Sequence, residues 1–345
     1  MNRKAVPRKS LTIEERRART ERVRARQNRI ATQMPKPGQG LKTRAIVLHI
    51  GAHKTASSFL QTLLKGHSVE LAQRGVGVVH RSHLLASPLQ EALIAIGKGQ
   101  AVKPPLMLAA AQSLRGMLAR RKPHVLFSSE DLLHRIRDLG FFANAGKALE
   151  FVKSLAGPIP VRVVLYTRSQ ADYIESVYMQ FMHLGRDFTF EEFIERLDGN
   201  DYSWKRVLDE MAAVVGPENV TAVPYEAIKR LGSAEFYRRF LEACGVPDAG
   251  SLQVPAEAES SRGANRSYSA DALKIAKFVG PMIDESQRAE LRKFLQENFS
   301  TATHAKVELF TPEGRAKLLE SCAQDNRALF ETWLKDWPEE RRFYV

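Results

Sequence analysis

The stretch AIVLHIGAHKTASSFLQTLL, residues 45–64, changes its pattern halfway along. It begins as a continuous apolar run of strand length and ends with leucines at helical spacing before Gly66. Between these two parts lies a small, cationic turn that is rich in hydroxyl groups: Gly51, Lys54, Thr55, Ser57 and Ser58. We therefore expect a strand, a tight turn and a helix in immediate succession.

This composition suits an anion. At a helix N-terminus several backbone N–H groups point to one spot, and the helix dipole adds positive potential there. Gly51 lets the backbone approach a ligand closely, and Lys54 supplies a mobile charge. We interpret the turn as a phosphate cradle. The alternative is an ordinary strand–helix turn whose Ser and Thr residues cap the helix.

The turn differs from the nucleotide P-loop G-x-x-x-x-G-K-[ST], in which Gly directly precedes Lys. Here His53 precedes Lys54, and Gly51 stands three residues before that Lys. The sequence offers no convincing acidic strand end for Mg²⁺ and no His, Cys, Asp and Glu cluster with zinc spacing. We therefore expect no metal.

A second stretch, VVLYTRSQADYIESVYMQ at residues 163–180, places Arg168 at the carboxyl end of a strand. Ser176 follows eight residues later on the next helix, which corresponds to about two helical turns. Both side chains can reach one anion if a short loop joins the strand to the helix. A strand-end Arg and a solvent-facing Ser with no shared ligand are the alternative.

Strands and helices alternate from residue 44 onward. We expect strands at 44–50, 75–80, 124–130, 161–167 and 219–226. We expect helices between them, including one at 131–139, and a mainly helical chain after the last strand. This order predicts a mostly parallel sheet covered on both faces, in a three-layer P-loop-like α/β fold with a helical C-terminal part.

Charge separates the N-terminal segment from the rest. Residues 1–44 hold 14 of the 52 Lys and Arg residues but only three of the 39 acidic ones. We predict a basic arm at 1–42, flexible or docked on an acidic partner or an anionic surface, and a single domain at 43–345. Nucleic acid is the weaker reading of this charge, because no aromatic residues are interleaved with it.

Cysteine content and hydropathy indicate the compartment. Cys244 and Cys322 are too sparse for a disulfide framework, which favours a reducing environment. No apolar run approaches the roughly 20 residues that span a bilayer. The N-terminus is charged, so we expect no secretory signal. Together these features favour a cytoplasmic protein.

Two motifs resemble one enzyme family. HIGAHKTASSFLQ, residues 49–61, resembles the 5′-phosphosulfate loop of PAPS-dependent sulfotransferases, written H-x-G-x-x-K-T-G-T-T-x-L-Q in bacterial members. RSQADYIES, residues 168–176, is similar to the segment that binds the 3′-phosphate in this family. Weaker likenesses follow the family order at LAQRGVGVVH, LFSSEDL, ENVTAVPYEAI and SRGANRSYSADAL. The resemblance implies a P-loop fold and PAPS as the co-substrate.

The resemblance also implies roles for individual residues. Lys54 would contact the phosphosulfate and stabilise the leaving phosphate, while Arg168 and Ser176 would hold the 3′-phosphate that distinguishes PAPS from ATP. The 5′-phosphate would be held by the backbone and hydroxyls of the turn: Gly51, Thr55, Ser57 and Ser58. A late loop over the nucleotide would contain Arg262, Asn265 and Arg266.

Ala56 departs from the family motif, which has Gly at this position. Its methyl group would either crowd the sulfuryl group or stiffen the start of the helix. This departure bears more on turnover than on phosphate binding.

Two residues are candidates for the general base that takes the proton of a hydroxyl acceptor. Glu130 ends a strand that we expect near the loop strand, although Ser128 and Asp131 also have capping-box spacing for a helix start. His53 lies within the loop itself and is otherwise a hydrogen-bonding residue of that loop.

The sequence is therefore typical of a sulfotransferase that moves a sulfuryl group from PAPS to a hydroxyl, with a glycan or glycolipid as the acceptor class that the resemblance implies. One alternative is a P-loop small-molecule kinase that uses ATP and Mg²⁺. Another is a non-catalytic protein that retains a nucleotide-binding fold and docks a partner through its arm.

Overall fold

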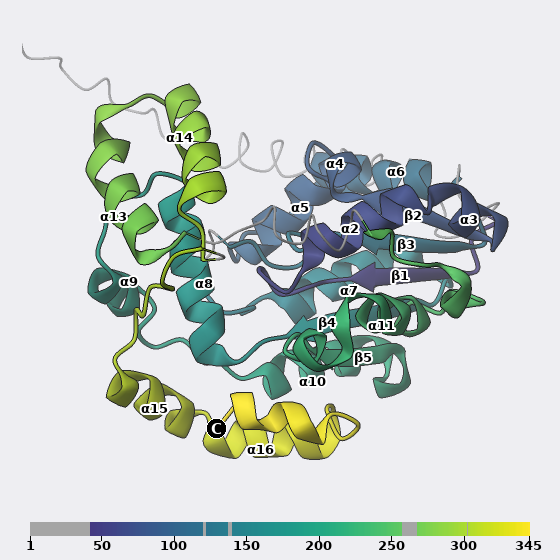
Figure 1. Cartoon of the computed structure of the whole chain (residues 1–345). Coiled ribbons are helices and arrows are strands. Elements are labelled where there is room, and N and C mark those ends of the chain that lie inside the picture. The colour runs from purple at the N-terminus through teal and green to yellow at the C-terminus, as the bar shows by residue number, and fades with distance from the viewer. Residues whose placement is uncertain (1–41, 120–121, 137–139, 257–267, 302) are drawn as a thin grey trace, which may run out of the picture.

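The computed structural model describes residues 42–119, 122–136, 140–256, 268–301 and 303–345. A five-stranded parallel sheet lies at the centre of the molecule, in the order β2-β3-β1-β4-β5 (Figure 1). Its strands are β1 (Ala45–His49), β2 (Val76–His80), β3 (His124–Ser128), β4 (Val161–Thr167) and β5 (Val220–Pro224). All five lie within or on the expected ranges, and their parallel order confirms the predicted fold class.

Helices connect the strands and continue beyond them. Those before β5 are α2 (Ser57–Gly66), α3 (Ser68–Gln73), α4 (Arg81–Leu84), α5 (Pro88–Gly97), α6 (Pro104–Ala119), α7 (Ala145–Ala156), α8 (Gln170–His183), α9 (Phe190–Arg196) and α10 (Trp204–Val215). Those after it are α11 (Ala227–Ala243), α13 (Ala270–Val279), α14 (Glu285–Asn298), α15 (Pro312–Ser321) and α16 (Ala323–Thr332). The mainly helical C-terminal part was expected.

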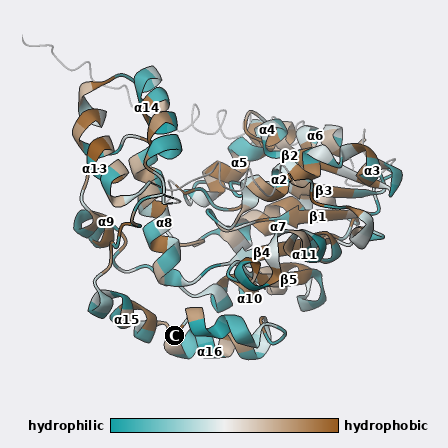
Figure 2. Ribbon diagram, viewed as in Figure 1, coloured by the Kyte–Doolittle hydropathy of each residue, from teal (hydrophilic) through white to brown (hydrophobic). Residues whose placement is uncertain are grey.

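Both faces of the sheet are buried, because successive strand residues point to opposite sides. In β1, Ile46 and Leu48 join a large core formed with α5, α6, α7 and α10. Val47, between them, joins a second core formed with α2, α3 and α11. The strands are accordingly hydrophobic along their length (Figure 2). The result is the three-layer arrangement that the alternating pattern predicted.

The C-terminal helices extend this core at one end. α8 packs against α13 and α15, and α13 and α14 stand beside each other away from the sheet (Figure 1). The side chain of Tyr344, next to the last residue, is completely buried. None of the described helices combines the length and hydropathy needed to cross a membrane. Of the predicted arm at 1–42, only Lys42 lies within the described residues.

The helix expected at 131–139 is not formed over residues 131–136, which make turns and bends. Leu132, Leu133 and His134 are consecutive and all buried. A surface helix cannot bury every successive residue, because neighbours on it point about 100° apart. The capping role considered for Ser128 and Asp131 therefore does not apply. The Asp131 amide donates instead to the Ser129 hydroxyl, at 3.3 Å.

Candidate active site

The candidate site lies where three neighbouring strands end. β1 is the central strand and pairs with β3 on one side and with β4 on the other. Because all three are parallel, the loops after them, beginning at residues 50, 129 and 168, meet at one edge of the sheet. Ligands of open α/β sheets bind at this carboxyl edge.

The β1–α2 loop has an unusual backbone. Lys54 and Ala56 both have left-handed conformations, with φ of 69° and 62°, whereas Thr55 between them does not. Such an alternation turns successive N–H groups toward one point and forms a nest for an anion. A left-handed conformation costs a residue other than Gly about 1–2 kcal/mol. Ala56 therefore adopts the conformation for which the Gly of the family motif is suited.

Gly51 is required by space rather than by its dihedral angles. A Cβ there would lie 2.8 Å from Ser57 Oγ and 3.1 Å from Thr55 Oγ1, so both hydroxyls gather around this residue. Thr55 donates its hydroxyl hydrogen to the Ala52 carbonyl at 2.5 Å. Among the described residues, the buried Ser57 hydroxyl has no partner. A buried donor without a partner is costly, and a bound ligand can satisfy it.

Positive charge gathers at this loop. Burial, followed by the charges of Arg168 and Arg292, lowers the pKa of Lys54 to about 8. Burial, followed by the charges of Lys54 and Arg292, lowers the pKa of His183, at the end of α8. Arg292 comes from α14 and was not foreseen from the sequence. Grouped cations in a partly buried place repel one another unless an anion lies between them.

Arg168 is held firmly next to the loop. Its Nη1 donates to the Lys54 carbonyl at 2.7 Å, and its guanidinium lies 5.1 Å from the centre of the Tyr225 ring. The indole of Trp204 donates to the Arg168 carbonyl at 2.7 Å. The Nε of Arg168 is buried and has no partner in the described part of the chain. Arg168 is therefore attached to the backbone of the β1–α2 loop at Lys54.

The end of β4 that carries Arg168 is clamped by distant residues. The Glu226 carboxylate accepts the Ser169 amide at 2.9 Å and the Tyr344 hydroxyl at 3.2 Å. That hydroxyl also lies 2.9 Å from Thr167 Oγ1. Burial raises the pKa of Glu226. No sequence signal pointed to this clamp, because Tyr344 lies 177 residues from Thr167.

Ser176 lies on α8 as predicted, but its contact is local. Its hydroxyl donates to the Tyr173 carbonyl at 2.7 Å, and its side chain is buried. Within the described part of the chain, no hydrogen bond joins Ser176 to Arg168. Ser58 is exposed on the first turn of α2. Arg262, Asn265 and Arg266 lie outside the described residues.

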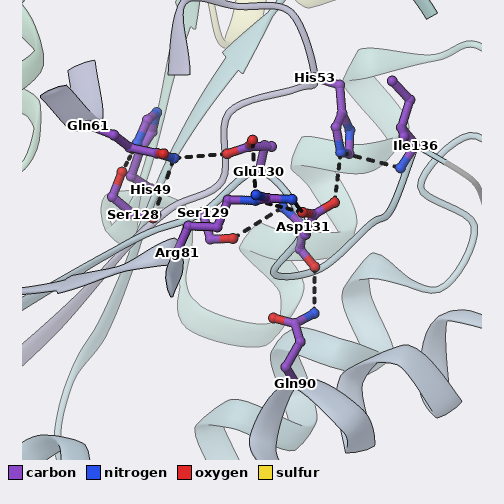
Figure 3. A network of polar contacts seen from close by, with 10 residues as sticks. All are labelled: His49, His53, Gln61, Arg81, Gln90, Ser128, Ser129, Glu130, Asp131 and Ile136. Atoms are coloured by element: carbon purple, nitrogen blue, oxygen red, sulfur yellow. Dashed lines mark hydrogen bonds and ion pairs between the residues drawn. The ribbon is translucent and has the colours of Figure 1, made fainter. Parts of the chain in front are cut away.

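A polar network follows β3 (Figure 3). Arg81 donates to Asp131 Oδ2 through Nε at 2.8 Å and Nη2 at 2.5 Å. Asp131 Oδ1 lies 3.1 Å from His53 Nε2. Burial alone would raise the pKa of Asp131, but the hydrogen bonds and charges of His53 and Arg81 lower it to about 2. Asp131 is therefore ionised at neutral pH.

Glu130 belongs to the same network, where it shares Arg81 with Asp131 but has Gln61 as its second partner (Figure 3). Its Oε2 accepts from Gln61 Nε2 at 2.8 Å, and its Oε1 lies 3.5 Å from Arg81 Nε. Gln61 comes from α2, so Glu130 ties this helix to the end of β3. The sequence placed Glu130 near the loop strand, and the β1–β3 pairing agrees.

His49, which ends β1, has a structural environment. Its Nδ1 is hydrogen-bonded to Ser128 Oγ at 2.9 Å, and burial lowers its pKa to about 3. It therefore stays neutral and joins β1 to β3. Among the described residues, no group of three or more His, Cys, Asp and Glu side chains is placed to hold a metal.

An apolar pocket borders the loop after β3. Its cavity volume is about 20 Å³, and it is lined by residues that include His134, Ile136, Phe141, Tyr173, Leu197 and Tyr202. The Ile136 amide lies 3.3 Å from His53 Nε2, and the His134 ring centre lies 6.0 Å from that of His53. One short segment therefore touches both His53 and the pocket.

No protein-family model matches the chain, and no curated protein matches it in sequence. The solved structures that are similar to it include the following two. The crystal structure of a sulfotransferase from Alicyclobacillus acidocaldarius is 15% identical with a TM-score of 0.38, over 72% of this chain and 99% of that one. The crystal structure of retinol dehydratase in complex with androsterone and inactive cofactor PAP is 14% identical with a TM-score of 0.38, over 85% of this chain and 81% of that one.

Proposed function

We propose that the protein is a sulfotransferase that moves a sulfuryl group from PAPS to a hydroxyl acceptor. The observation that carries this proposal is the β1–α2 loop, where a left-handed backbone, the unpartnered Ser57 hydroxyl and the cations Lys54 and Arg168 converge. Each of these features is costly without an anion and favourable with one. These residues belong to the motifs that resemble those of PAPS-dependent sulfotransferases, and this resemblance suggests a phosphosulfate as the anion.

The donor would lie across the ends of β1 and β4. The loop amides and Ser57 would bind the 5′-phosphate, as helix N-termini bind phosphates generally. Arg168, whose Nε has no partner among the described residues, would bind the 3′-phosphate. Ser176 would join it after its hydroxyl turns away from the Tyr173 carbonyl. A 3′-phosphate site is the feature that favours PAPS over ATP.

The transfer step needs charge stabilisation rather than a metal. The acceptor oxygen attacks sulfur in line, the bond from sulfur to the bridging phosphate oxygen breaks, and its electron pair remains on the leaving phosphate. Lys54 would stabilise the negative charge that develops on that oxygen. A base would take the proton of the acceptor hydroxyl.

The acceptor proposed from the resemblance is a glycan or a glycolipid. The pocket beside His53 has apolar and aromatic walls, including Phe141 and Leu197. Such walls suit an acceptor with an apolar part, because polar hydroxyls buried there would lose their hydration. The cavity volume of about 20 Å³ is close to that of a single water molecule, so the pocket does not by itself select a glycolipid over a free glycan.

A thermal-shift experiment tests the proposal. PAP, the desulfated product, should raise the melting temperature more than ADP does, since only PAP carries the 3′-phosphate. A ligand at about 100 times its Kd adds roughly 2.7 kcal/mol of stability, which a melting curve resolves. Equal shifts with PAP and ADP would argue against a 3′-phosphate site. A larger shift with ATP and Mg²⁺ would favour the kinase alternative.

Turnover separates the enzyme from a binding protein. Release of PAP from PAPS in the presence of a hydroxyl acceptor would support transfer. Tight PAP binding without release on any hydroxyl acceptor would favour the non-catalytic alternative. Ala56 is the first residue to replace in that case, because it departs from the family motif within the loop.

A further inference from the structure

Two adjacent carboxylates follow β3, and only one of them touches His53. Glu130 is bound by Gln61 at 2.8 Å and faces Arg81 at 3.5 Å. Asp131 shares Arg81 but also contacts His53 Nε2 at 3.1 Å (Figure 3). The two side chains therefore have one partner in common and differ in the second. Asp131 can therefore orient the His53 imidazole, whereas Glu130 has no direct contact with it in the described structure.

The contact between Asp131 and His53 determines where the imidazole proton lies. An ionised carboxylate only accepts hydrogen bonds, so the proton of the neutral ring must be on Nε2. The Ile136 amide, 3.3 Å from the same nitrogen, would favour the opposite tautomer. The shorter, charge-assisted contact to Asp131 outweighs it. His53 Nδ1 then carries a lone pair, and it is buried without a partner among the described residues.

Asp131 is itself held from two further sides. Arg81 binds its carboxylate through two nitrogens. The Gln90 side chain donates to its backbone carbonyl at 2.7 Å (Figure 3). A carboxylate fixed in this way keeps the imidazole from rotating, as the acid of a catalytic triad orients its histidine.

We propose that Asp131 is a positioning residue that holds His53 with Nδ1 free to take the proton of the acceptor, and that Glu130 is a structural link. The inference rests on the proposed sulfuryl transfer and adds the base to it. The acceptor O–H bond breaks as the oxygen bonds to sulfur, and the proton moves to Nδ1. Asp131 stabilises the imidazolium that results.

The charged and titratable groups around His53 are few. Asp131 contacts it directly, and Arg81 and Glu130 stand behind that carboxylate. His134 packs edge-on to its ring and stays neutral, because burial and then the charge of His53 lower the pKa of His134 to about 3. Lys54 is its neighbour in the chain. Asp131 is therefore the charged side chain that contacts His53 directly.

Nitrogen NMR of the imidazole tests the positioning without any acceptor. The full chain is labelled with [15N]histidine and saturated with PAP, and the signals of His53 are identified by their loss in His53→Gln. The wild-type chain should show a protonated Nε2 and an unprotonated Nδ1. Asp131→Asn should lose this preference, whereas the adjacent Glu130→Gln should keep it. A protonated Nδ1 in the wild type, or no change in Asp131→Asn, would overturn the inference.

Turnover of the same two variants tests the base. PAP release from PAPS is measured with water alone and with octyl β-glucoside, and PAP melting shifts verify that the donor site is intact. Asp131→Asn should lower kcat by about 10- to 100-fold. Glu130→Gln should leave kcat near the wild-type value, with at most a small loss of stability.

The outcomes separate this inference from the proposed function. A large loss of kcat in Glu130→Gln, with Asp131→Asn near normal, would transfer the base to Glu130 and leave sulfuryl transfer intact. If the wild type binds PAP but releases none from PAPS with either acceptor, the proposed transfer fails. The NMR result would still decide whether Asp131 positions His53.

Discussion

The loop after β1 and the segment after β3 lie side by side at the same sheet edge, yet they differ in how their polar groups are satisfied. The loop leaves the Ser57 hydroxyl and Arg168 Nε beside it without described partners, in a strained backbone. The segment after β3 binds both of its carboxylates with Arg81, Gln61 and His53. A region that binds a ligand keeps hydrogen-bond donors without protein partners, whereas a supporting region pairs its polar groups within the protein. The loop is thus the candidate donor site, and the segment positions side chains around it.

The largest expected effect concerns Lys54. Lys54→Ala should lower kcat by about 100- to 1,000-fold, the range seen when a group that stabilises transition-state charge is removed. PAP affinity should fall by less than tenfold, because the loop amides still bind the ground-state anion. Single-turnover kinetics and PAP titration measure the two effects separately. Equal losses in kcat and affinity would make Lys54 a binding residue and no more.

Arg168 tests the 3′-phosphate site. Arg168→Ala should remove the preference for PAP over ADP, so that both ligands give the same melting shift. The expected loss is roughly 1.5–3 kcal/mol, the contribution of a hydrogen bond to a charged group. Arg315→Ala is a suitable control, since Arg315 forms ion pairs with α8 at Asp172 and Glu175 but does not contact the loop. A preserved preference in Arg168→Ala would place the 3′-phosphate elsewhere.

Ala56 tests the strain in the loop. Ala56→Gly should stabilise the ligand-free fold by about 0.5–1 kcal/mol. It removes the strain of a left-handed Ala, and this gain exceeds the cost of the greater conformational entropy that Gly gives the unfolded chain. Ala52→Gly in the same loop is the matched control and should destabilise, since Ala52 is buried and not left-handed. Chemical denaturation measures both. Destabilisation in both variants would show that the Ala56 methyl contributes packing.

The smallest expected effect is the pH dependence that Lys54 contributes. Its pKa is lowered to about 8 in the folded chain, first by burial and then by Arg168 and Arg292, from an ordinary value of 10.5. The folded chain therefore loses this proton first, and ligand-free stability gains from Lys54 as pH rises from about 8 to 10.5. PAP binding loses a cation over the same range.

PAP-induced melting shifts at pH 7 and pH 9 measure this effect. The shift should be smaller at pH 9 in the wild-type chain, by no more than a tenfold change in affinity, about 1.4 kcal/mol. Lys54→Met, which keeps most of the side-chain volume, removes the titrating group and should reduce this difference. An unchanged difference in Lys54→Met would assign the pH dependence to other groups.

Local pattern predicted the architecture well. Apolar runs of strand length placed all five strands, and helical spacing placed the helices after β1 and β4, because these periods follow from backbone geometry. The prediction of a helix at 131–139 was wrong over 131–136, where packing overrides the local pattern. Leu132 and Leu133 are compatible with a helix in sequence, but long-range packing turned both of them, and His134, inward. The basic arm at 1–42 stays a prediction.

The sequence by itself determined the strand–turn–helix at residues 45–64 and the position of Arg168 at a strand end, since these depend on neighbours along the chain. Only the tertiary structure placed Asp131 against His53, 78 residues away, with Arg81 behind it. It alone brought Arg292 of α14 toward Lys54. A hydrogen bond between distant segments depends on how their elements pack, and residue spacing carries no information about that packing.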